Sequence, residues 1–352
     1  MMSAVRCLMA ALTCSQLASP LPVYAQERAT QQVREYLTIR PARIAIGSQD
    51  REGPDLFGSI AGVTMDTRRN VYVLDGSEQH VRVFSASGQH IGTVGRPGRG
   101  PGDLRDAMAV WHDGESSLFV VDRYDGISIF TTAGNRFRFE RRIGADLRPT
   151  AVCTIGQSVF VAGTRSARIL HSLRRTGEVM RSFGAPFRRD SMPGIQEVHD
   201  RADLVVMCDG RREQIVVAEG AQNKVRAYAT DGSLRWESAL PAYDGYAVGI
   251  NRQPRGIAVF WGTHLTRTIL PVGGDLLLVQ VSQQSRRRDP RRLGALAVTD
   301  TDIITYVLSA TGGGVLARGS AGPLVSLTRG GETVGYRLEP FPQAYLLQLA
   351  PR

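Results

Sequence analysis

Three aspartates and one histidine are the side chains whose type and placement could hold a metal ion. Asp66, Asp113 and Asp209 each follow a short, largely apolar run, and His112 directly precedes Asp113. Carboxylate oxygens suit calcium and zinc, and imidazole suits zinc. An aspartate at a tight turn also accepts hydrogen bonds from the backbone of that turn. We favour the turn role, because the 6 histidines show no metal-ligand spacing such as His-x-x-x-His.

Two other catalytic signatures are missing from the sequence. It contains no Gly-x-Ser-x-Gly nucleophile elbow. The segment from Gly95 to Gly102 is rich in glycine, but a phosphate-binding loop needs a Lys-Ser/Thr pair and a following helix. The sequence predicts neither feature here, so we expect no nucleotide site.

The sharpest charge feature is a group of arginines in the run SRRRDPRRL, residues 285–293, which we predict to be an inserted loop. It contains Arg286, Arg287, Arg288, Arg291 and Arg292. A solvated loop is the simpler interpretation. The alternative is an electrostatic contact with an acidic partner or an anionic membrane surface, and the salt sensitivity of binding would separate the two.

The overall charge does not predict nucleic-acid binding. The net charge is +10, but Lys224 is the single lysine, so the basicity is nearly all arginine. A GC-rich coding sequence gives this bias without any functional pressure, and exported proteins seldom meet nucleic acid.

The elements that must position these residues form a repeated pattern, which is clearest between Gly62 and Leu104. Val71 to Leu74 is a β-branched and aromatic run, typical of a fully buried strand. Val81 to Phe84 alternates apolar and polar residues, as a half-buried strand does. Ser87-Gly88 predicts the next hairpin turn. Four antiparallel strands of this length make one blade of a β-propeller.

This stretch resembles the NHL repeat of β-propellers. The resemblance rests on Asn-Val-Tyr-Val-x-Asp at residues 70–75 and on GRPGRGPGDL, from Gly95 to Leu104, which in that family closes one blade and leads into the next. Asp75, Asp122 and Glu219 recur after the second strand and resemble the acidic residue that pins a loop in these repeats. The resemblance implies the fold, whereas propellers host many unrelated functions.

We therefore predict an all-β protein, a six-bladed β-propeller of four-stranded antiparallel blades. Glycines in the turn between the third and fourth strands mark the register, at Gly88, Gly134, Gly177 and Gly232. The blades are expected at residues 56–95, 104–144, 147–184, 203–240, 262–318 and 323–350. The last blade lacks a strand, which an N-terminal segment at residues 42–47 is expected to supply. A seventh blade between Tyr243 and Trp261 is the less favoured alternative.

Residues 1–25 have the features of a secretory signal peptide, which leaves residues 26–352 for the propeller. Arg6 provides the positive region, Cys7 to Leu12 an apolar core, and Val23-Tyr24-Ala25 a cleavage site. We expect a periplasmic or secreted monomer. A lipoprotein anchored through Cys14 is the alternative. No later stretch is long and apolar enough to span a bilayer.

Two cysteines remain beyond residue 25, Cys153 and Cys208. Both are placed near the end of the first strand of a blade, in adjacent blades. An oxidising compartment permits a disulfide, but the bond requires Cα atoms within about 7 Å. The interpretation slightly preferred from the sequence is two separate buried thiols.

The function favoured by the sequence is binding. We expect an exported NHL-like scaffold that presents loops to a protein, peptide or glycan, without a cofactor. The rival is a metal-dependent hydrolase or lyase, because six-bladed lactonases bind calcium or zinc around the central channel. That resemblance makes Asp66, Asp113 and Asp209 weak candidates, with His112 at a strand end expected near the channel. A convergent ring of acidic, amide or histidine side chains would distinguish the enzyme, and the sequence does not assemble one.

Overall fold

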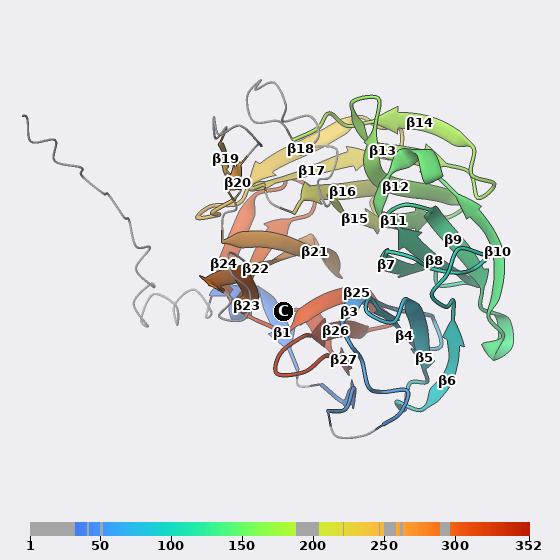
Figure 1. Cartoon of the computed structure of the whole chain (residues 1–352). Helices are drawn as coiled ribbons and strands as arrows, with labels where there is room; N and C mark the ends of the chain where they lie inside the picture. Colours follow the sequence, from blue (N-terminus) through green and yellow to red (C-terminus); the bar gives the residue numbers. More distant parts are fainter. Residues whose placement is uncertain are drawn as a thin grey trace, which may run out of the picture.

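The protein is a ring of antiparallel sheets with almost no helix (Figure 1). The structure is a computed structural model that describes residues 32–40, 42–49, 52–187, 204–220, 222–245, 247–249, 258–260, 263–288 and 296–352. The predicted signal peptide lies outside these residues. No helix within the described ranges has the length and apolar character needed to cross a membrane.

Across these ranges, six sheets have four strands each, and each is one blade. The first three blades are β3 (Ile60–Met65) to β6 (His90–Val94), β7 (Ala107–His112) to β10 (Arg138–Ile143), and β11 (Pro149–Ile155) to β14 (Val179–Phe183). The second and third strands of these blades are β4 (Val71–Asp75), β5 (His80–Phe84), β8 (Ser117–Asp122), β9 (Gly126–Thr131), β12 (Ser158–Arg165) and β13 (Arg168–Leu173). The first strand of each blade is the innermost one, which lies next to the central channel.

The other three blades repeat this order. Their strands are β15 (Leu204–Asp209), β16 (Gln214–Glu219), β17 (Lys224–Ala229), β18 (Leu234–Ala239), β21 (His264–Gly273), β22 (Leu276–Arg288), β23 (Leu296–Ser309), β24 (Val315–Ser320), β25 (Leu324–Arg329), β26 (Glu332–Arg337) and β27 (Gln343–Leu347). The fourth strand of the last blade is β2 (Ile44–Ile46), which pairs antiparallel with β27. The innermost strand of each blade contacts that of the next, and β25 contacts β3, so the ring is continuous.

Burial follows the predicted strand types. Every residue of β4 is buried, whereas β5 alternates until its last two residues, which are both buried. The apolar side chains gather in clusters between neighbouring blades. Gly88 and Gly232 have φ of +83° and +90° in their hairpin turns, a region that glycine enters without a steric penalty.

The fifth blade departs from the expectation. The arginine run was predicted as a loop, but its first part is strand: Arg286 pairs with Val298 and Arg288 with Leu296. The prediction failed because a charge run was treated as a loop signal, although arginine does not prevent extended backbone. β22 and β23 thus continue beyond β21 as a two-stranded ribbon, residues 284–288 paired with 296–300. Arg291 and Arg292 lie outside the described residues.

Two further short pairings lie outside the blades. β19 (Ala247–Gly249) pairs with β20 (Ala258–Phe260) between the fourth and fifth blades. This hairpin takes the place of the seventh blade considered above. β1 (Leu37–Ile39) pairs with β28 (Leu349–Pro351), which joins the two ends of the described chain.

Cys153 and Cys208 form a disulfide with a Cα–Cα distance of 5.6 Å. The slight preference for separate thiols was therefore wrong. Both cysteines lie on innermost strands, β11 and β15, as predicted. Innermost strands of adjacent blades run side by side in a propeller, and this proximity could not be measured from the sequence.

Candidate functional site

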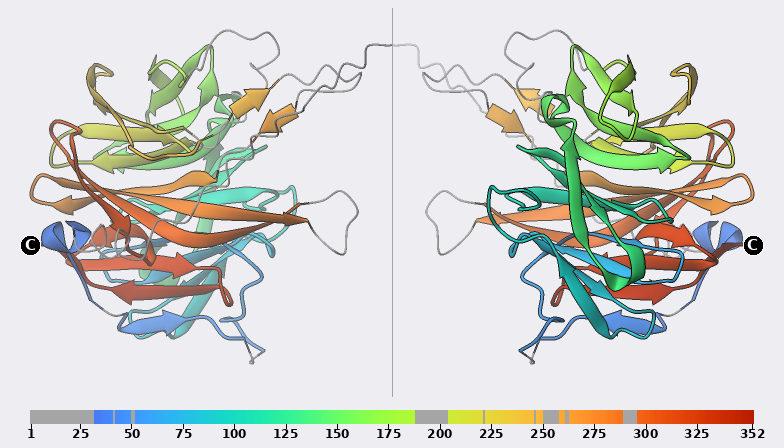
Figure 2. Two further views of the ribbon diagram at one scale, coloured as in Figure 1. Left: turned by 90° about the vertical axis from the view of Figure 1, so that its left-hand side faces the viewer. Right: turned by 90° about the vertical axis from the view of Figure 1, so that its right-hand side faces the viewer.

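The two faces of the ring differ. We call the linker face the one where the innermost strands begin; it carries the links between blades and the turns after second strands. The turn face is the opposite one, where the innermost strands end. The β22–β23 ribbon projects on the linker face, and the C-terminus lies on the opposite side (Figure 2). The β19–β20 hairpin is also an insertion between blades.

A cavity of about 240 Å³ occupies the central channel. Its walls come from all six innermost strands, mostly from the halves of these strands that lie nearest the linker face. Tyr336, at the end of β26, completes the wall. The cavity residues used below are Ala61, Met108, Trp111, Thr150, Arg267 and Ser326.

Five of these residues occupy one repeated position. In five blades the innermost strand carries one extra residue relative to its neighbour, a β-bulge near its start. The bulged residues are Ala61, Met108, Thr150, Arg267 and Ser326. Bulges change the direction of a side chain and are common beside functional sites. We call these five residues the bulge ring.

The two hydroxyls of the bulge ring connect neighbouring blades. Thr150 Oγ1 donates to Leu204 O at 3.1 Å, and Ser326 Oγ donates to Val63 O at 2.7 Å. Arg267 instead donates through Nε to Ser282 Oγ of its own blade, at 2.9 Å. The bulge ring thus contains two hydroxyls that link neighbouring blades and one positively charged side chain.

Trp111 forms the deep end of the cavity. It is the fifth residue of β7, further from the linker face than Met108, which also lines the cavity. Its ring packs against core clusters that include blades on the other side of the channel. Its Nε1 donates to Thr154 Oγ1 of the next blade at 3.1 Å. The indole therefore reaches across the channel.

The predicted metal candidates lie on the turn face, each held in a turn. Asp66 accepts bonds from the backbone N–H and the side-chain amide of Asn70, at 2.9 and 2.8 Å. Asp209 accepts one from the Arg211 N–H at 3.1 Å and pairs with Arg212 at 2.8 Å. Both carboxylates thus accept hydrogen bonds within their own turns.

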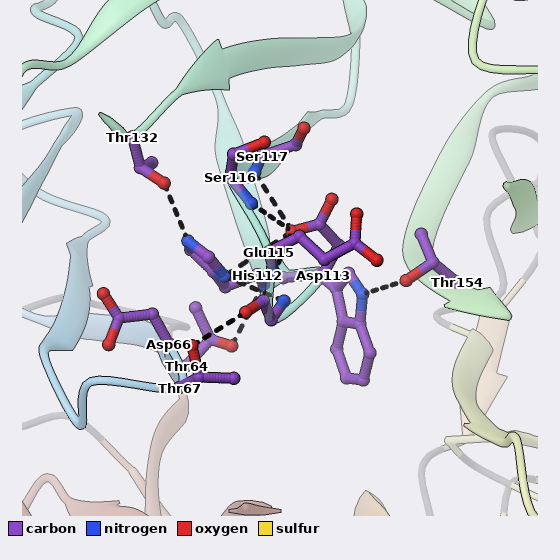
Figure 3. A network of polar contacts seen from close by, with 12 residues as sticks. Thr64, Asp66, Thr67, His112, Asp113, Glu115, Ser116, Ser117, Thr132 and Thr154 are labelled. Carbon is purple, nitrogen blue, oxygen red and sulfur yellow. Dashed lines mark hydrogen bonds and ion pairs between the residues drawn. The ribbon is translucent and has the colours of Figure 1, made fainter. Parts of the chain in front are cut away.

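Asp113 is bonded still more completely. Its Oδ1 accepts the N–H groups of Glu115, Ser116 and Ser117, at 2.9 to 3.1 Å (Figure 3). Its Oδ2 pairs with Arg175 Nη1 at 2.8 Å. Burial raises the pKa of Asp113, but the Ser117 N–H and Arg175 more than offset this effect, so the pKa lies below its ordinary value.

His112 does not line the cavity; it is fully buried beside Tyr72. The Gly114 N–H donates to Nδ1 at 3.0 Å, so the ring proton sits on Nε2 and is donated to Thr132 Oγ1 at 2.9 Å. Burial is the main cause that lowers the pKa of His112 to about 4. A neutral imidazole with both nitrogens bonded is a structural residue, as the turn role implied.

These bonds leave little for an ion. Within the described ranges, no three His, Cys, Asp or Glu side chains gather closely enough to hold a metal. Asp66, Asp113 and Asp209 do not converge on the channel cavity, and none of them lines it. Among the described residues that line the cavity, Arg267 is the one that is charged at neutral pH.

The acidic residues after the second strands lie on the linker face. Asp75 accepts the N–H groups of Gly58 and Ser59 from the incoming link, and Asp122 accepts those of Arg105 and Asp106 in the same way. The loop-pinning role of these two is confirmed. Glu219 is 5% exposed at the equivalent register, and burial raises its pKa to about 8.

Arg267, Trp111 and Thr150 were missed by sequence reasoning. A bulge has no sequence signature of its own here, since the bulged residues are Ala, Met, Thr, Arg and Ser. The available signal was the polar run Thr266-Arg267-Thr268 at the start of the fifth blade. Arg286, Arg287 and Arg288 are placed by their backbones on the ribbon of the linker face.

The architecture defines the class of protein: a six-bladed β-propeller. No family model and no curated protein matches the sequence. Solved structures do resemble it. A member of the DUF4221 family from Bacteroides vulgatus shares 9% identity with a TM-score of 0.57, over 90% of this chain and 99% of that one. A Bacteroides fragilis protein named as exported shares 10% identity with a TM-score of 0.52, over 90% and 95%. At these identities the likeness shows the fold alone.

Proposed function

We propose that the protein is an exported, NHL-like binding scaffold that takes a protein, peptide or glycan on its linker face. The observation that carries this proposal is the asymmetry of the two faces. The ribbon and the channel cavity belong to the linker face, whereas the aspartates of the turn face are bonded within their own turns. Loops and insertions on a rigid scaffold are where proteins most often bind.

Export is supported by two features. Residues 1–25 have the composition of a signal peptide. The disulfide between Cys153 and Cys208 suits an oxidising compartment. The Bacteroides fragilis neighbour is also named as exported, which agrees with this proposal.

The arginines of the ribbon favour a negatively charged partner. Arg286, Arg287 and Arg288 follow one another on a strand that continues beyond β21, so the ribbon carries three consecutive cationic residues. An acidic protein segment is the occupant that this charge favours. Such contacts weaken as salt screens them, over a Debye length of about 10 Å at 0.1 M.

The test is binding to immobilised polyglutamate at increasing salt. The parent should bind at low salt and lose at least about tenfold in affinity by 0.5 M. The triple variant Arg286→Ser, Arg287→Ser, Arg288→Ser should bind weakly at all salt concentrations. A second triple variant serves as the control, because it removes the same charge from the edge of the second blade. It carries Arg136→Ser, Arg138→Ser and Arg141→Ser, and it should bind like the parent.

Equal binding by the two triple variants would refute the role of the ribbon. Binding to anionic vesicles but not to polyglutamate would replace the acidic protein with a membrane surface.

A further inference from the structure

The two ends of the central channel differ. The cavity reaches Trp111, one residue before the end of β7, but it goes no further toward the turn face. It is lined by none of the six residues that end the innermost strands, Met65, His112, Ile155, Asp209, Gly273 and Arg329. The cavity therefore ends at the indole, before it reaches the turn face.

Arg329 connects three consecutive blades at this end of the channel. It is the last residue of β25, in the sixth blade. Its Nη1 donates to Met65 O, and its Nη2 donates to His112 O at 2.9 Å. Met65 and His112 are the last residues of β3 and β7. One planar guanidinium thus bonds the strand ends of the sixth, first and second blades.

Gly114 leaves the space against which the guanidinium packs. A Cβ at this position would lie 3.1 Å from Arg329 Cζ and 3.3 Å from both Nη atoms. The turn around Gly114 is itself held, because its N–H donates to His112 Nδ1 and its carbonyl accepts the Thr67 hydroxyl, both at 3.0 Å. The φ of Gly114 is +94°, which residues with a side chain adopt only with strain. The glycine thus supports both the turn and the position of Arg329.

The charge of Arg329 favours this closed arrangement. Burial lowers the pKa of the guanidinium, whereas the carboxylates of Asp113 and Asp66 oppose this effect. Arginine remains protonated at neutral pH, and a partly buried charge that loses its hydrogen bonds is unfavourable. We therefore expect Arg329 to stay on its two carbonyls in solution.

We propose that Arg329 and Trp111 close the turn-face end of the channel, so that a ligand enters and leaves through the linker face alone. We call these two side chains the channel floor. The inference deepens the proposed function and rests on it for the existence of a ligand. A closed floor admits a chain end or a side chain of the partner into the cavity of about 240 Å³. It does not allow a polymer to pass through the ring.

The test measures how strongly acrylamide quenches the fluorescence of Trp111. All proteins carry Trp236→Phe and Trp261→Phe, so that Trp111 is the one tryptophan left of 3. Arg329→Ala should raise the Stern–Volmer constant about twofold or more, because water and small solutes can then reach the indole from the turn face. Arg329→Met keeps the length of the side chain without its donors, so its constant should lie between those of the parent and Arg329→Ala.

Two controls separate opening of the floor from a general loss of stability. Ile46→Ala weakens the packing of the outermost strand β2, and Arg174→Ala removes an exposed arginine of the turn face that pairs with Glu178. Both should be quenched like the parent at a temperature at which melting curves show every variant to be folded.

The proposal would be overturned if Arg329→Ala were quenched like the parent, or if Ile46→Ala rose as much as Arg329→Ala. If Arg329→Ala does not fold, Arg329→Met decides, and a constant equal to that of the parent would overturn the proposal in the same way. The measurement needs no ligand, so its outcome is separate from the binding of polyglutamate by the ribbon.

Discussion

At the scale of single residues, the aspartates and His112 of the turn face belong to a network of hydrogen bonds and ion pairs. The carboxylate of Asp113 accepts three backbone N–H groups and pairs with Arg175. His112 uses both ring nitrogens. A side chain whose type suggests a metal ligand in the sequence can thus form its hydrogen bonds within its own turn.

The first prediction concerns Asp113. Asp113→Ala removes four hydrogen-bonding partners and leaves Arg175 without its carboxylate, so we expect a loss of about 2–4 kcal/mol. Asp113→Asn keeps an oxygen for the turn and should cost less. Because we expect no resident ion, a chelator should not change the melting temperature of the parent. A marked chelator effect that disappears in the variants would favour the metal-dependent enzyme.

The second prediction concerns Glu219. Its pKa is raised to about 8 from an ordinary 4.5, so the folded state holds a proton that the unfolded chain releases between these values. Stability from this group is complete below pH 4.5 and is lost as the pH rises to 8. Glu219→Gln should match the parent near pH 5 and exceed it by at least about 1 kcal/mol at pH 9.

Denaturant titrations at several pH values would check this. His112 acts in the opposite sense, because its lowered pKa makes stability fall as the pH drops from about 6.5 to 4. The comparison of parent and variant isolates Glu219 from that background. Parallel pH curves for the two proteins would contradict the prediction.

At the scale of elements, the disulfide links the innermost strands of the third and fourth blades across 55 residues. Constraining a loop of that length in the unfolded chain stabilises the fold by about 2–4 kcal/mol. The double variant Cys153→Ala, Cys208→Ala should lose about this amount in denaturant unfolding, and the reduced parent should behave similarly. A double variant with the midpoint of the oxidised parent would show that the bond adds no stability.

Most strands could be predicted because the sequence patterns that indicate them involve only residues close together in the chain. The buried run Val71–Leu74 and the hairpin glycines define blades without reference to distant residues. The disulfide, the bulge ring and the β22–β23 ribbon could not be predicted, because each depends on the register or proximity of separate strands. The walls of the channel cavity depend on the register of the bulges and on the proximity of the innermost strands, which explains why Arg267 and Trp111 were not predicted.

At the scale of the whole molecule, we predict that one short strand from the N-terminal region, β2, stabilises the ring. Ile46 of β2 is 3% exposed and packs in the cluster between the last and first blades. Ile46→Ala should therefore cost about 2–4 kcal/mol in unfolding experiments. Leu316→Ala on β24, the outermost strand of the fifth blade, is the matched control. Leu316 is 42% exposed, so its loss should stay within about 0.5 kcal/mol. Similar losses in the two variants would argue against a special role for β2.

The pairing of β1 with β28 sets how the molecule can be oriented. Pro351 lies 3.6 Å from the position a Cβ would take at Gly273, at the end of β21, so both paired strands sit on the turn face. A tether attached before residue 37 or after residue 351 would therefore attach the protein through its turn face. The linker face would point away from the support, whether that support were a bead, a sensor chip or a lipid layer. Immobilisation through either end should leave the linker face accessible from solution.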